Sequence, residues 1–285
     1  MYKKIVVGTD LSKTSRTAVG HAASLARSLG AELVLLHAGA DPGAPLRDLA
    51  ESVGAEAVCM PGNPAEVLLS ESDRIGADLL VVGSVGMAGT KRFMLGNVPN
   101  KVSHHANKDL LIVKTDRRGS RDGEGYKKIL VGTDGSPTAM RAVKMASDLS
   151  KHLSIRPSIV TAYQPPTEHE LEALRKSDVY SQWNAPKAQR DTPSEFQWRI
   201  ADASQAEDIL ERAEQCAADK GVDADVRAVK GSPAEILLAI AQDEDFDLIA
   251  VGSVGMAGAK RFMLGNVPHR LSHHTPTDIL ILHTA

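Results

Sequence analysis

One stretch of eighteen residues occurs twice in this chain with a single difference. Residues 82–99 read VGSVGMAGTKRFMLGNVP, and residues 251–268 repeat them with Ala259 in place of Thr90. Each copy follows a short apolar run that predicts a buried strand, so the glycines begin where that strand ends and a loop opens. Open α/β sheets bind ligands at such strand ends. The repeat therefore predicts two copies of one α/β ligand site.

The duplication extends beyond the loop to whole domains. Residues 2–10 return as residues 126–134, 124 positions later, whereas the offset at the loop is 169. The second half therefore carries 45 extra residues between these two points. Residues 115–125 contain no apolar residue and three glycines, which is typical of an exposed linker. We expect domains over residues 1–115 and 126–285, a linker over 116–125, and an insertion at about 165–203.

Composition is consistent with two globular domains in the cytoplasm. With 285 residues, of which 42% are hydrophobic, the chain is long enough for two cores. The net charge of -3 gives no reason to expect a nucleic-acid partner. No run approaches the ~20 apolar residues of a membrane span, and we expect no membrane association. Cys59 and Cys216 lie at non-equivalent positions, which predicts reduced thiols rather than a disulfide.

Changes of hydrophobic period give the order of elements within each repeat. In the first repeat we expect strands at 5–7, 32–37, 56–60, 78–82 and 110–114, and helices at about 14–29, 46–52, 64–74 and 99–106. In the second repeat, residues 203–220 are expected to form the full second helix. Strands that alternate with helices predict an open, mostly parallel five-stranded sheet with helices on both faces, once per repeat.

The last strand of each repeat, at 110–114 and 278–282, is apolar and would leave an exposed edge. If these two strands paired with each other, both edges would be covered. We therefore expect an internal pseudo-dimer of the two domains. Self-association as a homodimer and the identity of any protein partner stay open.

The glycine-rich loop has the chemistry of an anion site. Glycine lets backbone amides turn inward, and the start of the next helix adds about half a positive charge. Lys91-Arg92 and Lys260-Arg261 lie within the loops. They either screen phosphates or form a solvated face of the loop.

The motif Gly83-x2-Gly86-x9-Gly96-Asn97, together with Gly8-Thr9-Asp10-x-Ser12, resembles the universal stress protein family of the kind that binds adenine nucleotides. The second copy reads Gly252-x2-Gly255-x9-Gly265-Asn266, with Gly132-Thr133-Asp134-Gly135-Ser136. The resemblance covers nearly the whole chain twice, apart from the linker and the insertion. It implies a Rossmann-like fold of the adenine nucleotide α-hydrolase-like kind and a role in the stress response.

The resemblance also implies an ATP clamp in each repeat, for ATP or for AMP or ADP, with Mg²⁺ or Mn²⁺ as a possible companion held largely by phosphate oxygens. Thr9 and Asp10 would meet the adenosine, Ala38 would flank the adenine, and the loop would wrap the phosphates. The expected nucleotide-binding residues are Gly8, Thr9, Asp10, Ala38, Gly83, Gly86, Gly96, Asn97 and Val98 in the first repeat, and Gly132, Thr133, Asp134, Ala162, Gly252, Gly255, Gly265, Asn266 and Val267 in the second.

Both copies depart from the family pattern at one position. The family has Ser or Thr after the last glycine, where a hydroxyl helps to hold phosphate oxygens, and this chain has Asn97 and Asn266. Asparagine can cap a helix, and its side-chain NH₂ can donate to an anion. Pro99 and Pro268 then remove one N–H from the first helical turn.

The sequence does not point to catalysis or to a metal held by protein side chains alone. No nucleophile elbow, P-loop or HExxH motif is present. The pairs His104-His105 and His273-His274 are adjacent residues, which point about 100° apart on a helix and do not form an i, i+4 clamp. We therefore expect no metal site at these pairs and no dedicated enzyme, with slow ATP hydrolysis as a weaker alternative.

The insertion is rich in aromatic residues, with Tyr180, Trp183, Phe196 and Trp198 close together. These residues either form a lid or partner surface, or pack against their own domain. Two readings of the whole chain remain: a nucleotide-responsive regulatory protein, and an interaction scaffold that keeps the loop for structure. The near-identity of the two loops favours the first.

Overall fold

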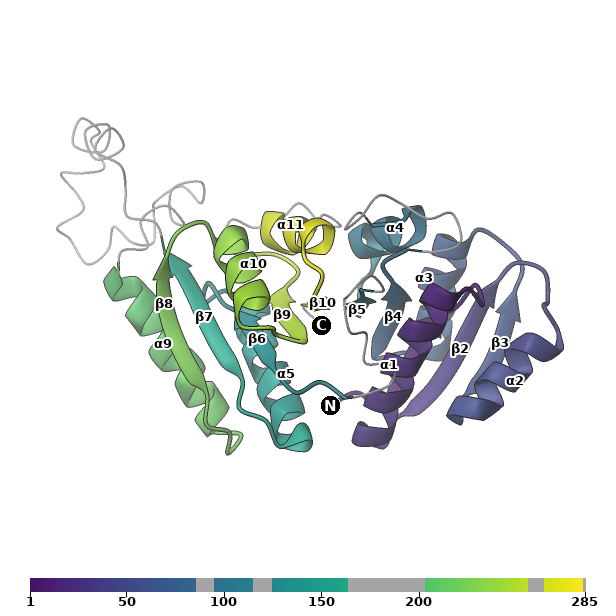
Figure 1. The fold of residues 1–285 in the computed structure, drawn as a ribbon, viewed down its shortest axis with the longest axis horizontal. Coiled ribbons are helices and arrows are strands. Elements are labelled where there is room, and N and C mark those ends of the chain that lie inside the picture. Colours follow the sequence, from purple (N-terminus) through teal and green to yellow (C-terminus); the bar gives the residue numbers. More distant parts are fainter. Residues whose placement is uncertain (86–94, 115–124, 164–202, 256–263, 284–285) are drawn as a thin grey trace.

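The computed structural model describes residues 1–85, 95–114, 125–163, 203–255 and 264–283, in which a ten-stranded sheet carries helices on both faces (Figure 1). The first repeat contains β1 (Lys4–Gly8), α1 (Lys13–Leu29), β2 (Glu32–Ala38), α2 (Ala44–Val53), β3 (Glu56–Met60), α3 (Pro64–Ile75), β4 (Leu79–Gly83), α4 (Asn97–His105) and β5 (Asp109–Val113). The second contains β6 (Ile129–Gly132), α5 (Pro137–Leu153), β7 (Ser158–Tyr163), α9 (Ala203–Ala218), β8 (Asp225–Lys230), α10 (Pro233–Asp243), β9 (Leu248–Gly252), α11 (Asn266–His274) and β10 (Asp278–Leu282).

Two layers of helices enclose the sheet because successive strand residues point to opposite faces. Ile5 and Val7 of β1 belong to the core under α1, α2, α5 and α9, whereas Val6 belongs to the core under α3, α4, α10 and α11. The predicted arrangement of helices on both faces is therefore confirmed. None of the helices in the described part of the chain is long and apolar enough to cross a bilayer.

Several element ends differ from the sequence-based prediction. α4 begins at Asn97 rather than near Pro99, because Gly96 has extended angles (φ -64°, ψ 167°) and is the N-cap. β5 ends at Val113, so Lys114 lies just beyond the strand. α2 is longer than the predicted segment 46–52, and it ends at Gly54, which has φ 71° and is suited to a left-handed cap.

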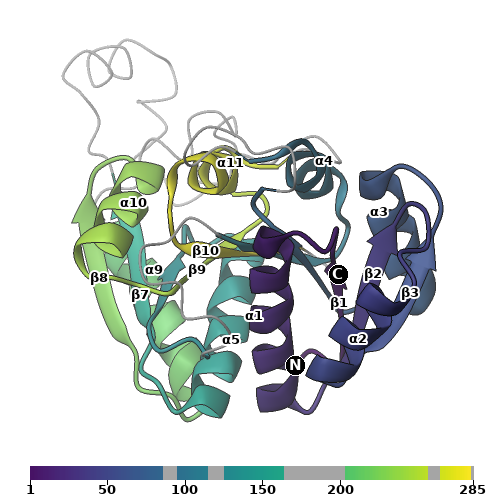
Figure 2. The ribbon, with the colours of Figure 1, turned by 45° about the vertical axis from the view of Figure 1, so that its right-hand side comes forward.

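The last strands of the two repeats pair with each other, as predicted. The strand order is β3-β2-β1-β4-β5-β10-β9-β6-β7-β8, and β5 and β10 are antiparallel. Leu111 stands opposite Leu280, and Ile112 opposite Ile279. All other neighbouring strands are parallel. This pairing joins the two half-sheets, and α1 and α5 lie next to each other beneath it (Figure 2).

A buried aspartate anchors the start of β5. Asp109 is 2% exposed and accepts hydrogen bonds from the Tyr2 hydroxyl at 2.9 Å and the His283 amide at 3.0 Å. The Arg141 guanidinium of α5 binds both of its carboxylate oxygens. Because Arg141 and His283 belong to the second repeat and Tyr2 to the first, Asp109 ties the two repeats together.

Asp278 holds the equivalent place at the start of β10. It accepts from the Tyr126 hydroxyl at 3.0 Å and from the Lys114 amide at 2.7 Å. From the opposite repeat, His21 of α1 places its Nδ1 3.2 Å from the carboxylate. The pseudo-twofold junction is thus symmetric in its aspartates and tyrosines, but the basic side chain beside each aspartate differs: Arg141 at Asp109 and His21 at Asp278.

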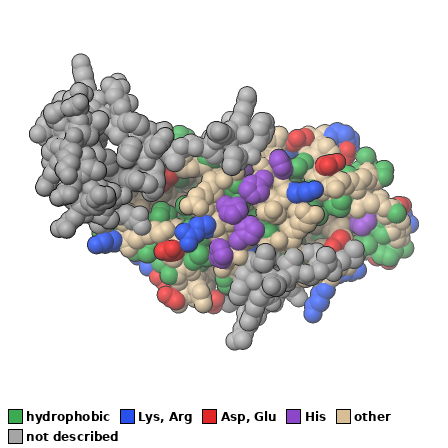
Figure 3. Space-filling view, turned by 90° about the horizontal axis from the view of Figure 1, so that it is seen from above, with side chains coloured by type: hydrophobic (Ala, Val, Ile, Leu, Met, Phe, Trp, Pro, Cys, Tyr) green, Lys and Arg blue, Asp and Glu red, His purple; other side chains and the backbone are tan. Residues whose placement is uncertain are grey.

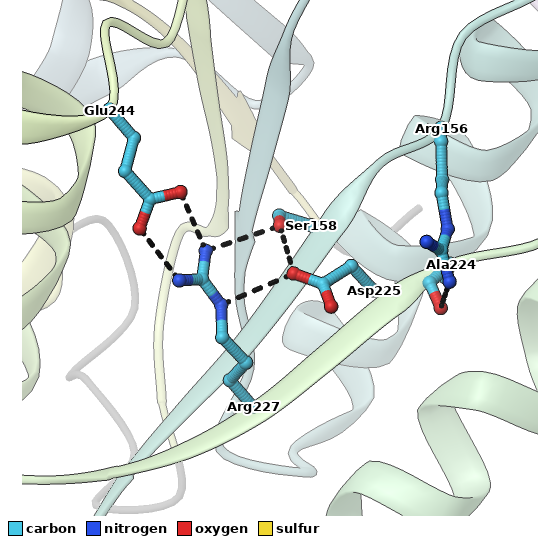
Figure 4. A network of polar contacts seen from close by, with 6 residues as sticks. All are labelled: Arg156, Ser158, Ala224, Asp225, Arg227 and Glu244. Atoms are coloured by element: carbon cyan, nitrogen blue, oxygen red, sulfur yellow. Dashed lines mark hydrogen bonds and ion pairs between the residues drawn. The ribbon is translucent and has the colours of Figure 1, made fainter.

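β8 is the last strand of the sheet among the described residues, and a polar network links it to β7 and to the end of α10 (Figure 4). Arg227 binds both oxygens of Glu244, at 2.6 and 3.1 Å, and its Nε lies 3.3 Å from Asp225. Ser158 donates to Asp225 at 2.8 Å. The hydrogen bond from Arg227 lowers the pKa of Glu244. Charged side chains of this kind discourage an edge strand from pairing with another molecule.

Candidate functional site

The predicted binding residues lie on both sides of a switch point in each half-sheet. From β1 the chain moves outward to β2 and β3 and then returns to β4, on the other side of β1. β6 and β9 are neighbours in the same way. A crevice opens at the carboxyl ends of strands where the order reverses. Gly8-Thr9-Asp10 and Gly83 border this position in the first repeat, and Gly132-Thr133-Asp134 and Gly252 border it in the second.

The turn after β1 is fixed by its own side chains. The Thr9 amide donates to the Leu36 carbonyl at 3.0 Å, and Thr9 Oγ1 accepts from the Leu11 amide at 3.1 Å. Asp10 Oδ1 accepts from the Ser12 amide at 3.0 Å, and Ser12 is the side-chain N-cap of α1. One carboxylate oxygen of Asp10 therefore holds the turn, and the half-buried side chain lies beside the switch point of the sheet.

The second repeat builds the same turn. Asp134 Oδ1 accepts from the Ser136 amide at 3.0 Å, and Thr133 Oγ1 accepts from the Gly135 amide at 3.2 Å. Gly135 has φ 76°, and Leu11 has φ 62° at the equivalent position of the first repeat. A leucine with positive φ is uncommon, because its Cβ makes this backbone conformation sterically costly. The second repeat has glycine at the same position and adopts the conformation without that cost.

Identical hydrogen bonds close the base of each glycine-rich loop. The Ser84 amide donates to the carbonyl of Val113 at 2.8 Å, and the Gly96 amide donates to the carbonyl of Ser84 at 2.8 Å. In the second repeat Ser253 donates to Leu282 at 2.8 Å, and Gly265 donates to Ser253 at 2.7 Å. The predicted residues Gly86, Lys91-Arg92 and Lys260-Arg261 lie outside the described residues, as does the aromatic insertion.

The second loop begins in close contact with the carboxylate after β6. A Cβ placed on Gly255 would lie 2.5 Å from Asp134 Oδ2, so any larger residue there would displace the Asp134 carboxylate. Thr138 of α5 donates to the carbonyl of Val254, and a Cβ on Gly252 would lie 2.8 Å from the Ala139 amide nitrogen. The structure therefore places the predicted residue Asp134 against the predicted residue Gly255, whereas Gly252 packs against the start of α5.

The first repeat is more open at the matching glycine. A Cβ on Gly83 would have its nearest neighbours at 3.6 Å, in ordinary contact. The two repeats thus share the hydrogen bonds that close the base of the loop but differ in how tightly the helix packs against the end of the glycine-bearing strand.

The starts of α4 and α11 present backbone donors beside the loops. Gly96 and Gly265 are the N-caps, so Asn97 and Asn266 are the first helical residues and not the caps, contrary to the capping role considered for them. Both asparagine side chains are exposed. The first amides of a helix have no acceptor within the helix. The third helical residue, Pro99 in α4 and Pro268 in α11, has no N–H. The amides of Asn97 and Val98, or of Asn266 and Val267, therefore remain as donors to an anion.

The ends of β2 and β7 place a different side chain in each site. His37 Nδ1 lies 2.9 Å from the Thr9 carbonyl, whereas Thr161 Oγ1 donates to the equivalent Thr133 carbonyl at 2.7 Å. The predicted residues Ala38 and Ala162 follow directly and are half-buried. Sequence reasoning did not single out His37 or Thr161, although the offset of 124 aligns them.

The histidine pairs lie at the ends of α4 and α11, and His104 and His273 are half-buried. Both contact His269, which the sequence analysis did not consider. His269 precedes His273 by four residues, so the i, i+4 spacing could have identified this pair.

Comparison with known proteins gives one consistent result. The sequence model of the universal stress protein family matches residues 1–58, 47–114 and 125–283. A universal stress protein of Mycobacterium tuberculosis is 30% identical over 160 residues, which cover 56% of this chain and 97% of that protein. The crystal structure of a universal stress protein from Archaeoglobus fulgidus is 16% identical and superposes with a TM-score of 0.68 over 99% of this chain and 98% of the other. A further solved universal stress protein, 27% identical with a TM-score of 0.39 over 56% of this chain and 98% of its own, is in complex with cAMP. This chain belongs to the universal stress protein family.

Proposed function

We propose that the chain binds ATP, or the related nucleotides AMP or ADP, at one site in each repeat. We further propose that it acts as a regulatory protein of the stress response rather than as a dedicated enzyme. The observation that carries this proposal is the contact between Asp134 and Gly255, which places a carboxylate against the start of a glycine-rich loop at a switch point of the sheet. A carboxylate there can accept hydrogen bonds from the ribose hydroxyls, while the loop holds the phosphates.

Charge and hydrogen-bond donors fit a nucleotide in this crevice. The amides of Asn97 and Val98 begin α4, and those of Asn266 and Val267 begin α11, at the positive ends of the helix dipoles. Each of the two sites in the chain would therefore offer a carboxylate to the sugar and helix amides to the phosphates. Mg²⁺ or Mn²⁺ would enter with the nucleotide, held mainly by phosphate oxygens.

A binding role is favoured over catalysis by the way the acidic residues are used. Asp10 and Asp134 each hold a turn amide with Oδ1. A general base needs to be within reach of the proton that it removes, and under this proposal the remaining carboxylate oxygens face the sugar rather than the phosphates. Steady-state turnover with ATP at a rate typical of enzymes, about 1 s⁻¹ or more, would replace the regulatory proposal with an ATPase.

The decisive experiment combines nucleotide identification with thermal shifts. The purified full chain is denatured and the released small molecules are identified by mass spectrometry. The chain is then titrated with ATP-Mg²⁺, AMP, ADP and cAMP, and the melting temperature and stoichiometry are measured. We expect an adenine nucleotide and two sites per chain. No adenine nucleotide and no thermal shift would support the scaffold alternative.

Site-specific variants assign the two sites. Asp10→Asn and Asp134→Asn keep the oxygen that holds the turn but remove the charge, so each should weaken one site by about 1 kcal/mol, or roughly fivefold. Gly255→Leu should abolish the second site only, because its side chain would collide with Asp134. Asp48→Asn, an exposed residue of α2, is the matched control. Equal affinity in all four variants would contradict the proposed sites.

A further inference from the structure

The two repeats carry the same glycine-rich loop in different surroundings. α4 and α11, which follow the two loops, lie on one face of the molecule, where their histidine side chains gather (Figure 3). The first residues of the loops, 83–85 and 252–254, read Gly-Ser-Val in both repeats. A structural difference between these two segments therefore has its cause in the residues that pack against them, at the starts of α1 and α5.

One threonine has a different partner in each repeat. Thr14 of α1 and Thr138 of α5 are equivalent, 124 positions apart. The Thr14 hydroxyl lies 2.9 Å from Ser12 Oγ, the N-cap of α1. The Thr138 hydroxyl donates to the carbonyl of Val254 in the loop, and it lies 3.4 Å from the N-cap oxygen of Ser136. The same side chain therefore contacts the helix cap in the first repeat and reaches the loop in the second.

The start of the second loop is packed more tightly on two sides. Next to α5, a Cβ on Gly252 would lie 2.6 Å from Thr138 Oγ1, whereas the nearest neighbour of a Cβ on Gly83 would be 3.6 Å away. Next to α11, a Cβ on the N-cap Gly265 would lie 3.1 Å from the Ser253 carbonyl oxygen, and the equivalent distance in the first repeat is 3.6 Å. Thr138 is accordingly only 2% exposed.

A contact that is present only in the first repeat accounts for this difference. The Ser15 hydroxyl of α1 lies 3.1 Å from Thr9 Oγ1, which ties the start of the helix to the turn after β1. α5 has Ala139 at the equivalent position, and alanine cannot form such a hydrogen bond. The start of α5 lacks this tie and lies against its loop instead.

The second loop covers the carboxylate to which the proposed function assigns the ribose. Asp134 Oδ1 accepts from the Ser136 amide, and Gly255 lies against the other oxygen, because its Cβ would be 2.5 Å from Oδ2. A ribose hydroxyl has to approach a carboxylate oxygen to within about 2.5–3.0 Å to donate to it. Ribose therefore reaches Asp134 Oδ2 only after Gly255 moves away.

We propose that the Thr138 hydroxyl is a latch that holds the start of the second loop over Asp134, so that the first site binds nucleotide more tightly than the second. This inference rests on the proposed function, because it ranks the two nucleotide sites. Thr138 is a positioning residue that acts through Val254 and Gly255. Nucleotide entry at the second site breaks the hydrogen bond from Thr138 to Val254, which should lower the affinity of that site by about 2- to 10-fold.

The latch is tested first without nucleotide, by amide hydrogen exchange measured with NMR on the full chain. The Ser84 and Ser253 amides both follow glycine, and the Gly96 and Gly265 amides both follow leucine, so each pair has the same intrinsic exchange rate. Each pair also makes equivalent backbone hydrogen bonds. A difference within a pair therefore reports how often the loop opens. We expect the amides of the second repeat to exchange about 2- to 10-fold more slowly.

Three variants separate the latch from general packing. Thr138→Val keeps the shape of the side chain and removes the hydroxyl, so Ser253 and Gly265 should exchange about 2- to 10-fold faster. Thr138→Ser keeps the donor and should retain the wild-type rates. Thr14→Val is the matched control in the first repeat and should leave the exchange of both pairs unchanged. The Thr133 amide, which is bonded to β7, should be unaffected in every variant if the sheet is intact.

Calorimetry with ATP-Mg²⁺ then tests the order of the sites in chains that keep one site each. Gly255→Leu leaves the first site, and the equivalent Gly86→Leu leaves the second. We expect the chain with the first site to bind about 2- to 10-fold more tightly. Adding Thr138→Val to Gly86→Leu should raise the affinity by the same factor, whereas adding Thr14→Val to Gly255→Leu should leave it unchanged.

The possible failures are distinguishable. Equal exchange within both amide pairs of the wild type, or unchanged exchange in Thr138→Val, would refute the latch. Equal or weaker binding at the first site, or weaker binding after Thr138→Val, would refute the order of the sites. The absence of nucleotide binding by the wild type would overturn the proposed function together with the order of the sites, while the exchange rates would still decide whether the latch exists.

Discussion

Lys114 carries a buried charge at the junction of the repeats, and its burial makes stability depend on pH in a direction opposite to that of a salt-bridged lysine. The side chain is 6% exposed, and its Nζ donates to the Ser272 carbonyl of α11. Burial lowers the pKa of Lys114 from 10.5 to about 8, against the opposing attraction of Asp278. The folded chain therefore releases this proton at a lower pH than the unfolded chain.

The size of the effect follows from the two pKa values. Between pH 8 and 10.5 the unfolded state holds more protons on Lys114 than the folded state, so the free energy of unfolding rises with pH. Below pH 8 both states are protonated, and Lys114 adds no pH dependence. Integration from pH 7 to 9.5 gives a gain of about 2 kcal/mol from this one group.

The assay compares urea unfolding of the wild type and Lys114→Met at pH 7, 8, 9 and 9.5. We expect the difference in free energy of unfolding, wild type minus variant, to increase by about 2 kcal/mol across this range. The upper limit stays below the titration of Tyr2, whose pKa is raised well above 10 by burial and by Asp109. Lys101→Met changes an exposed lysine of α4 and supplies the baseline. Parallel pH curves for the wild type and Lys114→Met would refute the reasoning.

Three further predictions concern packing and hydrogen bonds, each measured as a change in the free energy of urea unfolding. Gly252→Ala should destabilise the chain by about 1–3 kcal/mol, because the added Cβ would press on the backbone of α5. The equivalent Gly83→Ala should change the free energy of unfolding by no more than about 0.5 kcal/mol. Equal effects of the two substitutions would contradict the difference in packing between the repeats. Tyr2→Phe removes a hydrogen bond to a buried carboxylate and should cost about 1.5 kcal/mol. This is the lower end of the range for hydrogen bonds to charged groups, because Asp109 keeps its other donors. An unchanged free energy of unfolding would mean that the hydroxyl contributes nothing to stability. Ser136→Ala removes the N-cap side chain of α5 and should cost about 1 kcal/mol. No loss of stability would mean that packing alone fixes the start of the helix.

The sequence was sufficient for features that depend on local periodicity. An uninterrupted apolar run such as Ile5, Val6 and Val7 predicts a strand that is buried on both faces, so the strands and both helix layers were predictable. The pairing of β5 with β10 was predictable as well, because an apolar last strand cannot remain at an open edge. The start of α4 was less certain, because Gly96 and Asn97 can both cap a helix and the choice depends on the loop that precedes them.

The packing of the candidate site could not be predicted from the sequence. The offsets between repeats identified Asp134 and Gly255, yet their contact depends on how α5 lies against β9. The same limit applies to His104 and His269, which are 165 positions apart in the sequence and meet only because β5 and β10 set two helices side by side. The burial of Lys114 is likewise a product of that junction.

The antiparallel β5–β10 pair has a consequence for how the chain responds to dilution. Two separate chains joined through such strands would come apart at low concentration, and their unfolding midpoint would change with concentration. Here both strands belong to one polypeptide, and a covalent connection keeps them at an effective concentration on the order of millimolar. Closure of the junction therefore does not depend on protein concentration, so the occupancy of the two nucleotide sites proposed above would depend on ligand rather than on abundance.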